Sequence, residues 1–201
     1  ITGGATTEKI DDVRAITNFS SGKMARALAR AFYYAGAEVK LLASFETANE
    51  PFLSLKFSSS SELLELCKSE CESANLLVMC AAVSDFVPTK IDGKIKKEDV
   101  GESLNLSLKR NVDILQSLKE LKCKKIGFKL EITNENALKS ARSMLEKKRL
   151  DAVCLNILGE KNGFASEQNE VNFITKNHEI LLPLASKDEI AGRIVELAAN
   201  L

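Results

Sequence analysis

The chain has 201 residues, of which 45% are hydrophobic and 28% are charged. That length suits one domain with a substantial core, and the composition is ordinary for a globular protein. Lysine plus arginine and aspartate plus glutamate each total 28, so no net charge draws the chain to nucleic acid or to a membrane surface. The sequence shows no signal peptide and no apolar run of membrane-spanning length.

The cysteines are odd in number and lie mostly in apolar runs: Cys67, Cys71, Cys80, Cys123 and Cys154. They predict reduced core thiols in a cytoplasmic protein, because disulfides persist mainly in oxidising compartments. Two of them are one helical turn apart, but a single histidine in the chain disfavours a metal cluster. The sequence leaves metal ligands unassigned.

Predicted strands and helices alternate along the chain. The stretch ITGG ends a first strand, and a helix (25–36), a strand (37–44), a helix (59–73) and a strand (75–83) follow. The second half predicts a helix capped by Asn111 (111–121), a strand (124–131), a helix (134–149) and a strand (150–158). Nearly continuous apolar strands between helices are typical of a parallel sheet covered on both faces. We predict one α/β domain over residues 1–201, Rossmann-like and doubly wound, with a mostly parallel sheet.

Two long segments interrupt this alternation. Residues 84–110 hold five lysines and predict a polar excursion, or flap, with a hairpin around Asp92-Gly93. Residues 159–180 predict a glycine-bearing loop and a second hairpin that turns at Lys176-Asn177. Loops of this length in a compact domain are usually functional.

The stretch NFSSGKM (18–24) follows the first strand and opens the first helix. Ser20 or Ser21 is a candidate N-cap, and Gly22 would let a ligand approach the helix N-terminus, which attracts anions. It is not a P-loop, because Thr17 replaces the first glycine and Met24 replaces the hydroxyl residue. An ordinary cap is the alternative, but a cap does not explain a loop of about 20 residues.

Three other segments carry candidate polar groups. Asp85 follows a buried strand, where it could bind ribose hydroxyls or a cation, or could merely cap a turn. Lys94 and Lys96 would share one face of a short strand, either to close over phosphates or to form a solvated edge. Asn111 and Phe128 suit a surface for a base and a sugar, with capping and core packing as the alternatives.

A nicotinamide-dependent oxidoreductase is a common expectation for this fold class. However, no glycine lies between Gly4 and Gly22, so the tight turn of G-x-G-x-x-G is absent. The second strand ends at Ala43-Ser44 rather than at an acidic residue for the ribose. The sequence therefore disfavours this class.

Seven stretches occur in a fixed order: ITGGATTEKIDDVRAITNFSSGKM, CAAVSDF, KIKK, RNVDIL, GFKLE, LDAVCLN and GFASEQNEV. Together they resemble the phosphopantothenate–cysteine ligase (phosphopantothenoylcysteine synthetase) family over essentially the whole chain. In most bacteria that family forms the C-terminal half of a bifunctional coenzyme A biosynthesis protein. The resemblance implies a flavin-dependent decarboxylase domain before Ile1, so FMN is expected only there.

The resemblance also implies a two-step ligation. The carboxylate of 4'-phosphopantothenate attacks the α-phosphate of CTP, which gives an acyl-cytidylate and pyrophosphate. L-cysteine then attacks the acyl group and releases CMP. Mg²⁺ is implied with CTP, and so is a homodimer in which a flap of one subunit, here TKIDGKIKKE, closes on the other subunit's site.

Site residues follow from the same resemblance, motif by motif. Asn18 is implied to contact the acyl intermediate, and Lys94 corresponds to an essential lysine, so both are expected to be catalytic. The implied substrate-binding residues are Ser20, Ser21, Gly22 and Lys23. The implied nucleotide-binding residues are Cys80, Ala81, Asp85, Lys94, Asn111, Val112, Asp113, Ile114, Phe128 and Lys148.

Some positions depart from the family pattern: Thr7, Ala25, Arg110, Val112 and Met144. Met144 replaces a lysine that contacts the nucleotide in many members, unless Arg142 or Lys147 substitutes for it. Thr7 and Met144 keep open a second hypothesis, in which the chain is a nucleotide-binding or scaffold domain without turnover.

Overall fold

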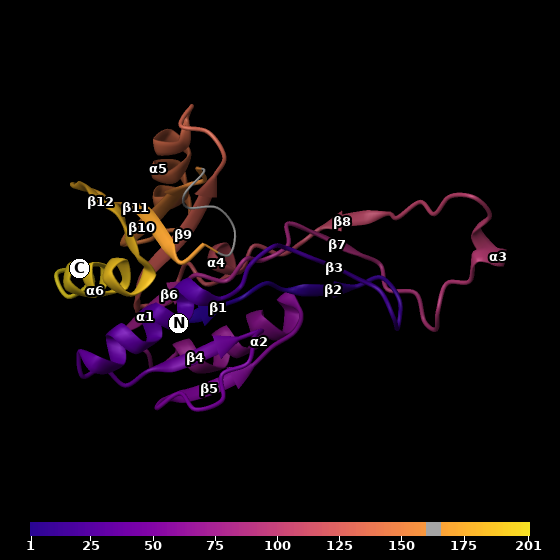
Figure 1. Ribbon diagram of the computed structural model, residues 1–201, viewed down its shortest axis with the longest axis horizontal. Helices are drawn as coiled ribbons and strands as arrows, with labels where there is room; N and C mark the ends of the chain where they lie inside the picture. The colour runs from indigo at the N-terminus through magenta and orange to yellow at the C-terminus, as the bar shows by residue number, and fades with distance from the viewer. Residues whose placement is uncertain (160–165) are drawn as a thin grey trace.

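The computed structural model describes residues 1–159 and 166–201. Within these residues eight strands form one sheet, in the order β12-β11-β10-β9-β6-β1-β4-β5 (Figure 1). Their bounds are β1 (Thr2–Gly3), β4 (Lys40–Ala43), β5 (Leu53–Lys56), β6 (Leu76–Met79), β9 (Lys124–Glu131), β10 (Ala152–Ile157), β11 (Gln168–Thr175) and β12 (Glu179–Ser186). The neighbouring pairs from β5 to β10 are parallel, whereas β11 is antiparallel to both β10 and β12. The predicted α/β class with a mostly parallel sheet is confirmed.

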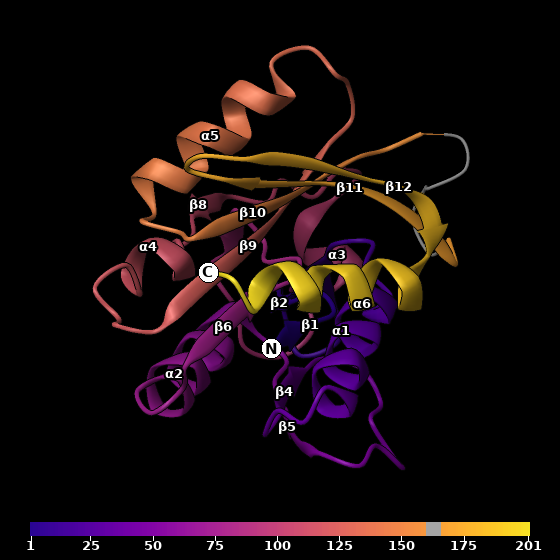
Figure 2. The ribbon, with the colours of Figure 1, turned by 90° about the vertical axis from the view of Figure 1, so that its left-hand side faces the viewer.

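Helices cover both faces of this sheet. The covering helices are α1 (Lys23–Tyr34), α2 (Ser60–Cys71), α4 (Ile114–Ser117), α5 (Ala137–Lys147) and α6 (Lys187–Ala198), whereas α3 (Lys97–Val100) lies away from the sheet. Helices α1 and α6 lie side by side over one face and share a core cluster with β6, β9 and β10 (Figure 2). Helices α2, α4 and α5 enclose a second cluster on the other face. Both faces of the parallel strands are therefore buried, as their continuous apolar sequences require.

Most predicted elements form close to their expected bounds, because their ends carry local signals. Ser59 and Glu62 make a capping box at the start of α2, where the serine hydroxyl accepts the Glu62 N–H at 3.3 Å. Strand β9 covers the predicted residues 124–131. The hairpin predicted at Lys176-Asn177 joins β11 to β12. Helix α6, which begins at a capping Ser186, was not anticipated.

The helix predicted from a cap at Asn111 is wrong in its start and its length. Helix α4 is short and begins after Asp113, whose carboxylate accepts the Gln116 N–H at 3.0 Å. Asn111 instead bridges two loop segments, since its amide nitrogen donates to the Ser84 carbonyl at 2.7 Å. The side-chain oxygen of Asn111 accepts the Val112 N–H at 2.8 Å, so the side chain does not cap the helix.

The predicted excursion at residues 84–110 and the loop after β1 fold together into a projecting arm, which we define as residues 7–17 and 86–110. The first loop contains a hairpin of β2 (Thr7–Lys9) and β3 (Ala15–Thr17). Strands β7 (Phe86–Pro88) and β8 (Leu108–Arg110) pair beside this hairpin, and α3 lies at the far end of the arm (Figure 1). The Ile91 N–H donates to the Ile10 carbonyl at 2.9 Å and ties the two segments together.

The expected hairpin at Asp92-Gly93 and the expected short strand at Lys94 do not form. Gly93 instead pairs with Asp12 across the arm, with hydrogen bonds of 2.9 and 3.0 Å. Long-range contacts with the first hairpin thus replace the local turn. In the motif GFASEQNEV and the loop predicted from residue 159, residues 160–165 lie outside the described residues.

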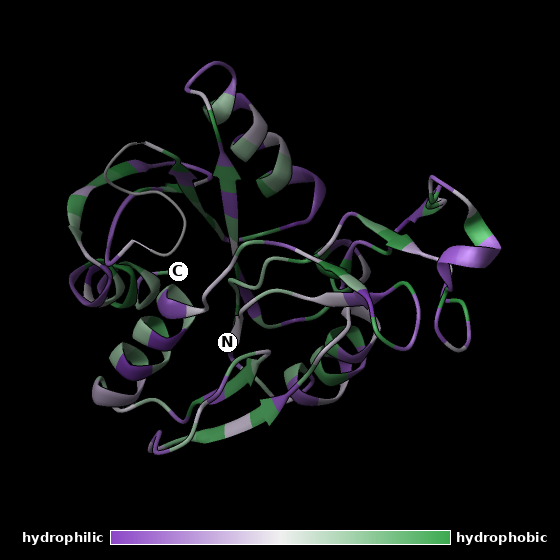
Figure 3. Ribbon diagram, turned by 45° about the vertical axis from the view of Figure 1, so that its right-hand side comes forward, coloured by the Kyte–Doolittle hydropathy of each residue, from purple (hydrophilic) through white to green (hydrophobic). Residues whose placement is uncertain are grey.

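Hydrophobic and hydrophilic residues alternate along the arm (Figure 3). Several of its apolar side chains are exposed. The most exposed of them are Val13 (64%), Phe86 (55%), Ile91 (48%) and Leu108 (43%). Elsewhere all five cysteines are free; four are buried, and Cys80 is partly buried. In the part of the chain that the structure describes, no helix is both long and apolar enough to cross a membrane.

Gly22 is required by the fold at the start of α1. Its φ of 73° is in the left-handed region, and an added Cβ would overlap the ring of Phe45. We expect Gly22→Ala to lower the free energy of unfolding by about 2–4 kcal/mol, from backbone strain plus overpacking. Gly36→Ala is the matched control, because its φ is 92° but nothing lies within 4 Å of the new Cβ.

We expect the control to cost only about 1–2 kcal/mol, which is the backbone term alone. Urea denaturation of both variants measures the difference. An equal loss in the free energy of unfolding for the two variants would show that the Phe45 ring moves aside. Packing at Gly22 would then not constrain the sequence.

Candidate functional site

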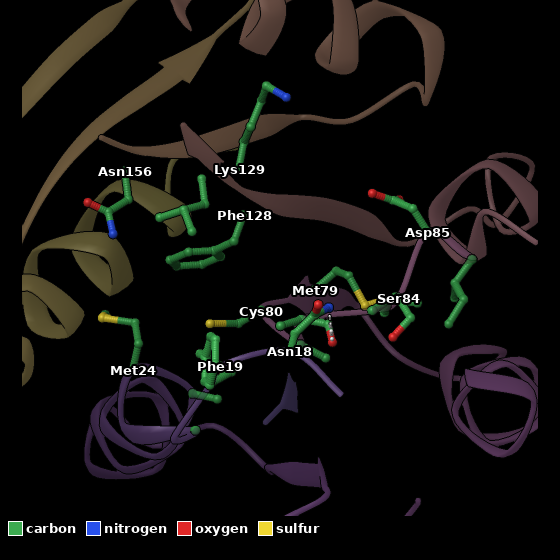
Figure 4. Close-up of a pocket in the computed structure, with 18 of the residues that line it drawn as sticks. Asn18, Phe19, Met24, Met79, Cys80, Ser84, Asp85, Phe128, Lys129 and Asn156 are labelled. Atoms are coloured by element: carbon green, nitrogen blue, oxygen red, sulfur yellow. Dashed lines mark hydrogen bonds between the residues drawn. The ribbon is translucent and has the colours of Figure 1, made fainter. Parts of the chain in front are cut away.

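A cleft of about 1040 Å³ lies beyond the carboxyl ends of the parallel strands, where ligands bind in sheets of this kind. Loops after β1 and β6, the segment before α4 and the end of β9 line it (Figure 4). The structure brings these predicted residues to its lining: Asn18, Ser20, Ser21, Gly22, Lys23, Cys80, Ala81, Asp85, Asn111, Val112, Asp113, Ile114, Phe128 and Lys148. They come from five separate stretches of the sequence, so only the fold assembles them.

The floor of the cleft is built where the loops after β1 and β6 run together. The Ala82 N–H donates to the Gly4 carbonyl at 2.8 Å, and the Thr6 N–H donates to the Ala82 carbonyl at 3.1 Å. The side-chain amide of Asn18 also donates to the Ala82 carbonyl, at 3.4 Å. Asn18 is thereby held at the floor, beside the main chain of the β6 loop (Figure 4).

One end of the cleft is formed by the start of α1. The predicted serine cap is wrong, because Gly22 is the N-cap and no side chain caps the helix. Gly22 also does not open its Cβ side to a ligand, since the ring of Phe45 occupies that space. The first N–H groups of a helix have no acceptor within the helix, and they favour an anion. The anion site predicted here therefore relies on main-chain groups and nearby cations.

Lysines from two helices add positive charge at this end. Lys23 begins α1 and pairs with Glu167, which lowers the pKa of the Glu167 carboxyl. Lys187 begins α6 and lines the same cleft. Burial lowers the pKa of Lys187, and the nearby charge of Lys23 lowers it further. Two cations and one carboxylate leave an excess of positive charge, which suits phosphate groups.

The other end of the cleft is bounded by α4, α5 and β9. Lys148 pairs with Asp113 at 2.9 Å, and Lys129 pairs with Glu131 at 3.0 Å. The second pair lowers the pKa of the Glu131 carboxyl. Phe128 provides an aromatic wall whose flat face suits a planar ring. This end combines one aromatic surface with charged groups that are already oriented.

Met144 lines the cleft and packs against the core cluster of that face. Neither of the two suggested substitutes for a lysine lies in this lining. Arg142 is turned to the sheet edge, where it pairs with Glu179 at 3.0 Å, and Lys147 is also outside the cleft. The interpretation that one of them replaces the lysine is therefore not supported by the geometry.

The structure adds polar residues that sequence reasoning did not select, among them Lys129, Asn156, Asn169 and Lys187. Three of them lie in quoted motifs, since Lys129 is in GFKLE, Asn156 closes LDAVCLN and Asn169 is in GFASEQNEV. Asn169 is buried, with its amide 3.8 Å from the sulfur of Met24. Lys187 carried no local signal, because only packing of α6 against α1 brings it to the cleft.

Lys94 does not line the cleft of its own chain. It lies on the arm, beyond β7, and is exposed. Among residues 1–159 and 166–201 its ammonium group makes no hydrogen bond or ion pair. The structure therefore separates Lys94 from Asn18 within one chain, although the sequence assigned both to catalysis.

Residues 1–201 match the family described as DNA/pantothenate metabolism flavoprotein C-terminal domain. The chain belongs to this family. The resemblance to the phosphopantothenate–cysteine ligase domain is thereby confirmed at the level of family. The fold agrees, because a crystal structure of the DNA/pantothenate metabolism flavoprotein from Streptococcus pneumoniae matches with a TM-score of 0.86. It is 26% identical, and the match covers 99% of this chain and 96% of that chain.

Two further relatives extend the comparison. The coenzyme A biosynthesis bifunctional protein CoaBC of Bacillus subtilis is 35% identical over 207 residues, which cover 100% of this chain and 50% of that protein. A solved C-terminal domain of a CoaBC protein is 32% identical, with a TM-score of 0.77 and coverage of 98% and 91%. The chain thus spans about half the length of the curated relatives it matches.

The chemistry of Cys80 in the cleft wall is testable. Burial raises the pKa of its thiol to about 12, so the thiol is neutral near pH 8 and is a poor nucleophile. We expect iodoacetamide to modify Cys80 on the order of 100-fold more slowly in the folded protein than in urea at pH 8. Peptide mass spectrometry measures the two rates. Equal rates would show that Cys80 is a reactive thiol rather than a neutral wall residue.

Proposed function

We propose that this domain ligates 4'-phosphopantothenate to L-cysteine, with CTP as the activating nucleotide, in coenzyme A biosynthesis. The observation that carries the proposal is the gathering of the implied substrate and nucleotide residues, apart from Lys94, around one cleft. Membership of the family, and relatives that are bifunctional coenzyme A biosynthesis proteins, support it. The free, mostly buried cysteines accord with a cytoplasmic site for this reaction.

The reaction needs activation, because a carboxylate is a poor acyl donor. An oxygen of the phosphopantothenate carboxylate attacks the α-phosphorus of CTP, and the bond to the β-phosphate breaks to release pyrophosphate. The amine of cysteine then attacks the acyl carbon, the bond to CMP breaks, and the amine loses a proton as the amide forms. The products are phosphopantothenoylcysteine, CMP and pyrophosphate.

The cleft offers a suitable group for each part of this chemistry. In the proposed reaction the side-chain amide of Asn18, which bonds to Ala82 at the floor, donates to the acyl-phosphate oxygen. The start of α1, with Lys23 and Lys187, supplies donors and charge for the phosphates. At the other end, Phe128 and the residues before α4 form the surface for the base and ribose. The choice of CTP over ATP follows the family resemblance.

Magnesium would enter with the nucleotide. In the described ranges, no three acidic, histidine or cysteine side chains come together as a metal site. Mg²⁺ commonly uses one or two carboxylates together with substrate phosphates, and Asp85 is an acidic side chain of the cleft lining. When bound, the ion would offset negative charge on the triphosphate, and Asp85 is the residue that we propose to hold it.

We propose that two copies of the domain form a homodimer through the arm. The apolar side chains of Val13, Phe86, Ile91 and Leu108 are exposed on the arm, and such groups favour a covered interface. Closure of the arm on the partner would also bring Lys94, which is remote from its own cleft, to the other active site. Two sites would then each depend on both subunits.

Release of pyrophosphate from CTP or ATP, with phosphopantothenate and with or without cysteine, tests the function and the nucleotide choice. We expect release with CTP before cysteine is added.

Asn18→Ala should lower turnover about 10²–10³-fold, which is typical for one lost donor to an oxyanion. Asn200→Ala is the matched control, since the exposed side-chain amide of Asn200 donates to the carbonyl of Glu196, outside the cleft lining. No release by the wild-type domain would instead favour the scaffold hypothesis that Met144 and Thr7 keep open.

The shared site makes a separate prediction about mixed dimers. Lys94→Gln should by itself abolish most pyrophosphate release. A mixture of Lys94→Gln and Asn18→Ala chains, unfolded and refolded together, should recover about a quarter of wild-type activity, because half the dimers then contain one intact site of two. The refolded single variants are the controls. If the mixture recovers nothing, Lys94 does not act across subunits.

A further inference from the structure

Asp11 is a fully buried carboxylate in the turn between β2 and β3, inside the arm. Its Oδ1 atom accepts the N–H groups of Val13 at 2.8 Å and of Arg14 at 2.7 Å. These bonds close the turn in the way that aspartate side chains commonly do. They occupy only one of the two carboxylate oxygens.

The second oxygen of Asp11 contacts the other segment of the arm. Its Oδ2 atom accepts the Ile95 N–H at 3.1 Å and lies 3.3 Å from Nη1 of Arg14. Nη2 of Arg14 donates in turn to the Ile95 carbonyl at 2.6 Å. One ion pair therefore holds both main-chain polar groups of Ile95.

Ile95 is the anchored residue of the lysine-bearing segment. It is the one buried residue of the range 91–99, and Lys94 and Lys96 stand on either side of it. Because the main chain and the side chain of Ile95 are both held, the main-chain atoms of the adjacent residues are restrained as well. The main-chain position of Lys94 is thus set by contacts between Ile95 and the first hairpin.

We propose that Asp11 is a positioning residue for Lys94 and acts through Ile95. This inference rests on the proposed function, in which Lys94 takes part in the release of pyrophosphate. A carboxylate is needed, because an asparagine that kept the two turn bonds would direct its NH₂ group at two donors, the Ile95 N–H and the guanidinium of Arg14. The hydrogen bonds between Asp12 and Gly93 remain in such a variant, so the segment would shift without detaching.

The first test compares Asp11→Asn with Asp92→Asn. Asp92 is on the same segment, but its side chain is fully exposed and accepts a long hydrogen bond from Lys90, at 3.4 Å. We expect Asp11→Asn to slow pyrophosphate release about 10- to 100-fold, the scale of a small misplacement of a catalytic group. Asp92→Asn should stay near wild type. Equal rates for the two variants would overturn the proposal.

A double variant separates positioning from a general structural role. If Asp11 acts only through Lys94, adding Asp11→Asn to Lys94→Gln should cause no further loss of rate. A further loss by the full factor of the single variant would show that the two residues act independently, and the proposal would be wrong. Should Asp11→Asn melt far below wild type, Ile95→Ala replaces it in the same cycle, since it removes the buried anchor of that segment.

Hydrogen exchange gives a readout that does not depend on the ligase assay. We expect main-chain amides of residues 90–97 to exchange faster in Asp11→Asn than in wild type or Asp92→Asn, while those of β9 stay unchanged. Unchanged exchange in residues 90–97 would overturn the positioning role. Failure of the wild-type domain to release pyrophosphate would instead overturn the proposed function, so the two failures are distinguishable.

Discussion

The backbone pairing between the loops that follow β1 and β6 determines the rest of this structure. Gly4 and Thr6 bond to the two main-chain groups of Ala82 and extend the parallel pairing past the end of the sheet. Thr6 and Ser84 continue it with buried side chains, since the Ser84 N–H donates to the Thr6 hydroxyl at 3.1 Å. Two segments that are about 80 residues apart therefore leave the sheet together and in the same direction.

The positions of both the cleft and the arm follow from the parallel course of these two segments. Near the sheet, the paired loops form the floor of the cleft and hold Asn18 beside Ala82. Farther out, the same segments become the arm, whose two halves are joined by Ile10, Asp11, Asp12 and Arg14 (Figure 1). A change in the arm can therefore alter where the lysines lie without altering the cleft. This arrangement is consistent with a site that two subunits complete.

Sequence signals worked best where structure is local. The apolar run of β9 and the capping box of α2 lie close to their predicted places, because short-range periodicity and caps determine them. Prediction from local sequence failed where a polar side chain had several possible hydrogen-bond partners. Asn111 was predicted to cap a helix but bonds to Ser84, 27 positions away, and Asp113 takes the capping role. A candidate cap cannot be distinguished from a long-range donor until the chain is folded.

By itself, the sequence determined the fold class and the family, and the family resemblance pointed to many of the residues that line the cleft. These properties are encoded in ordered motifs and in hydrophobic periodicity, which short stretches carry. Only the tertiary structure decided that Gly22 packs against Phe45, that Lys187 joins the cleft, and that Lys94 is remote from Asn18. Each of these depends on contacts between distant segments, and such contacts form only when the sheet aligns the segments in space.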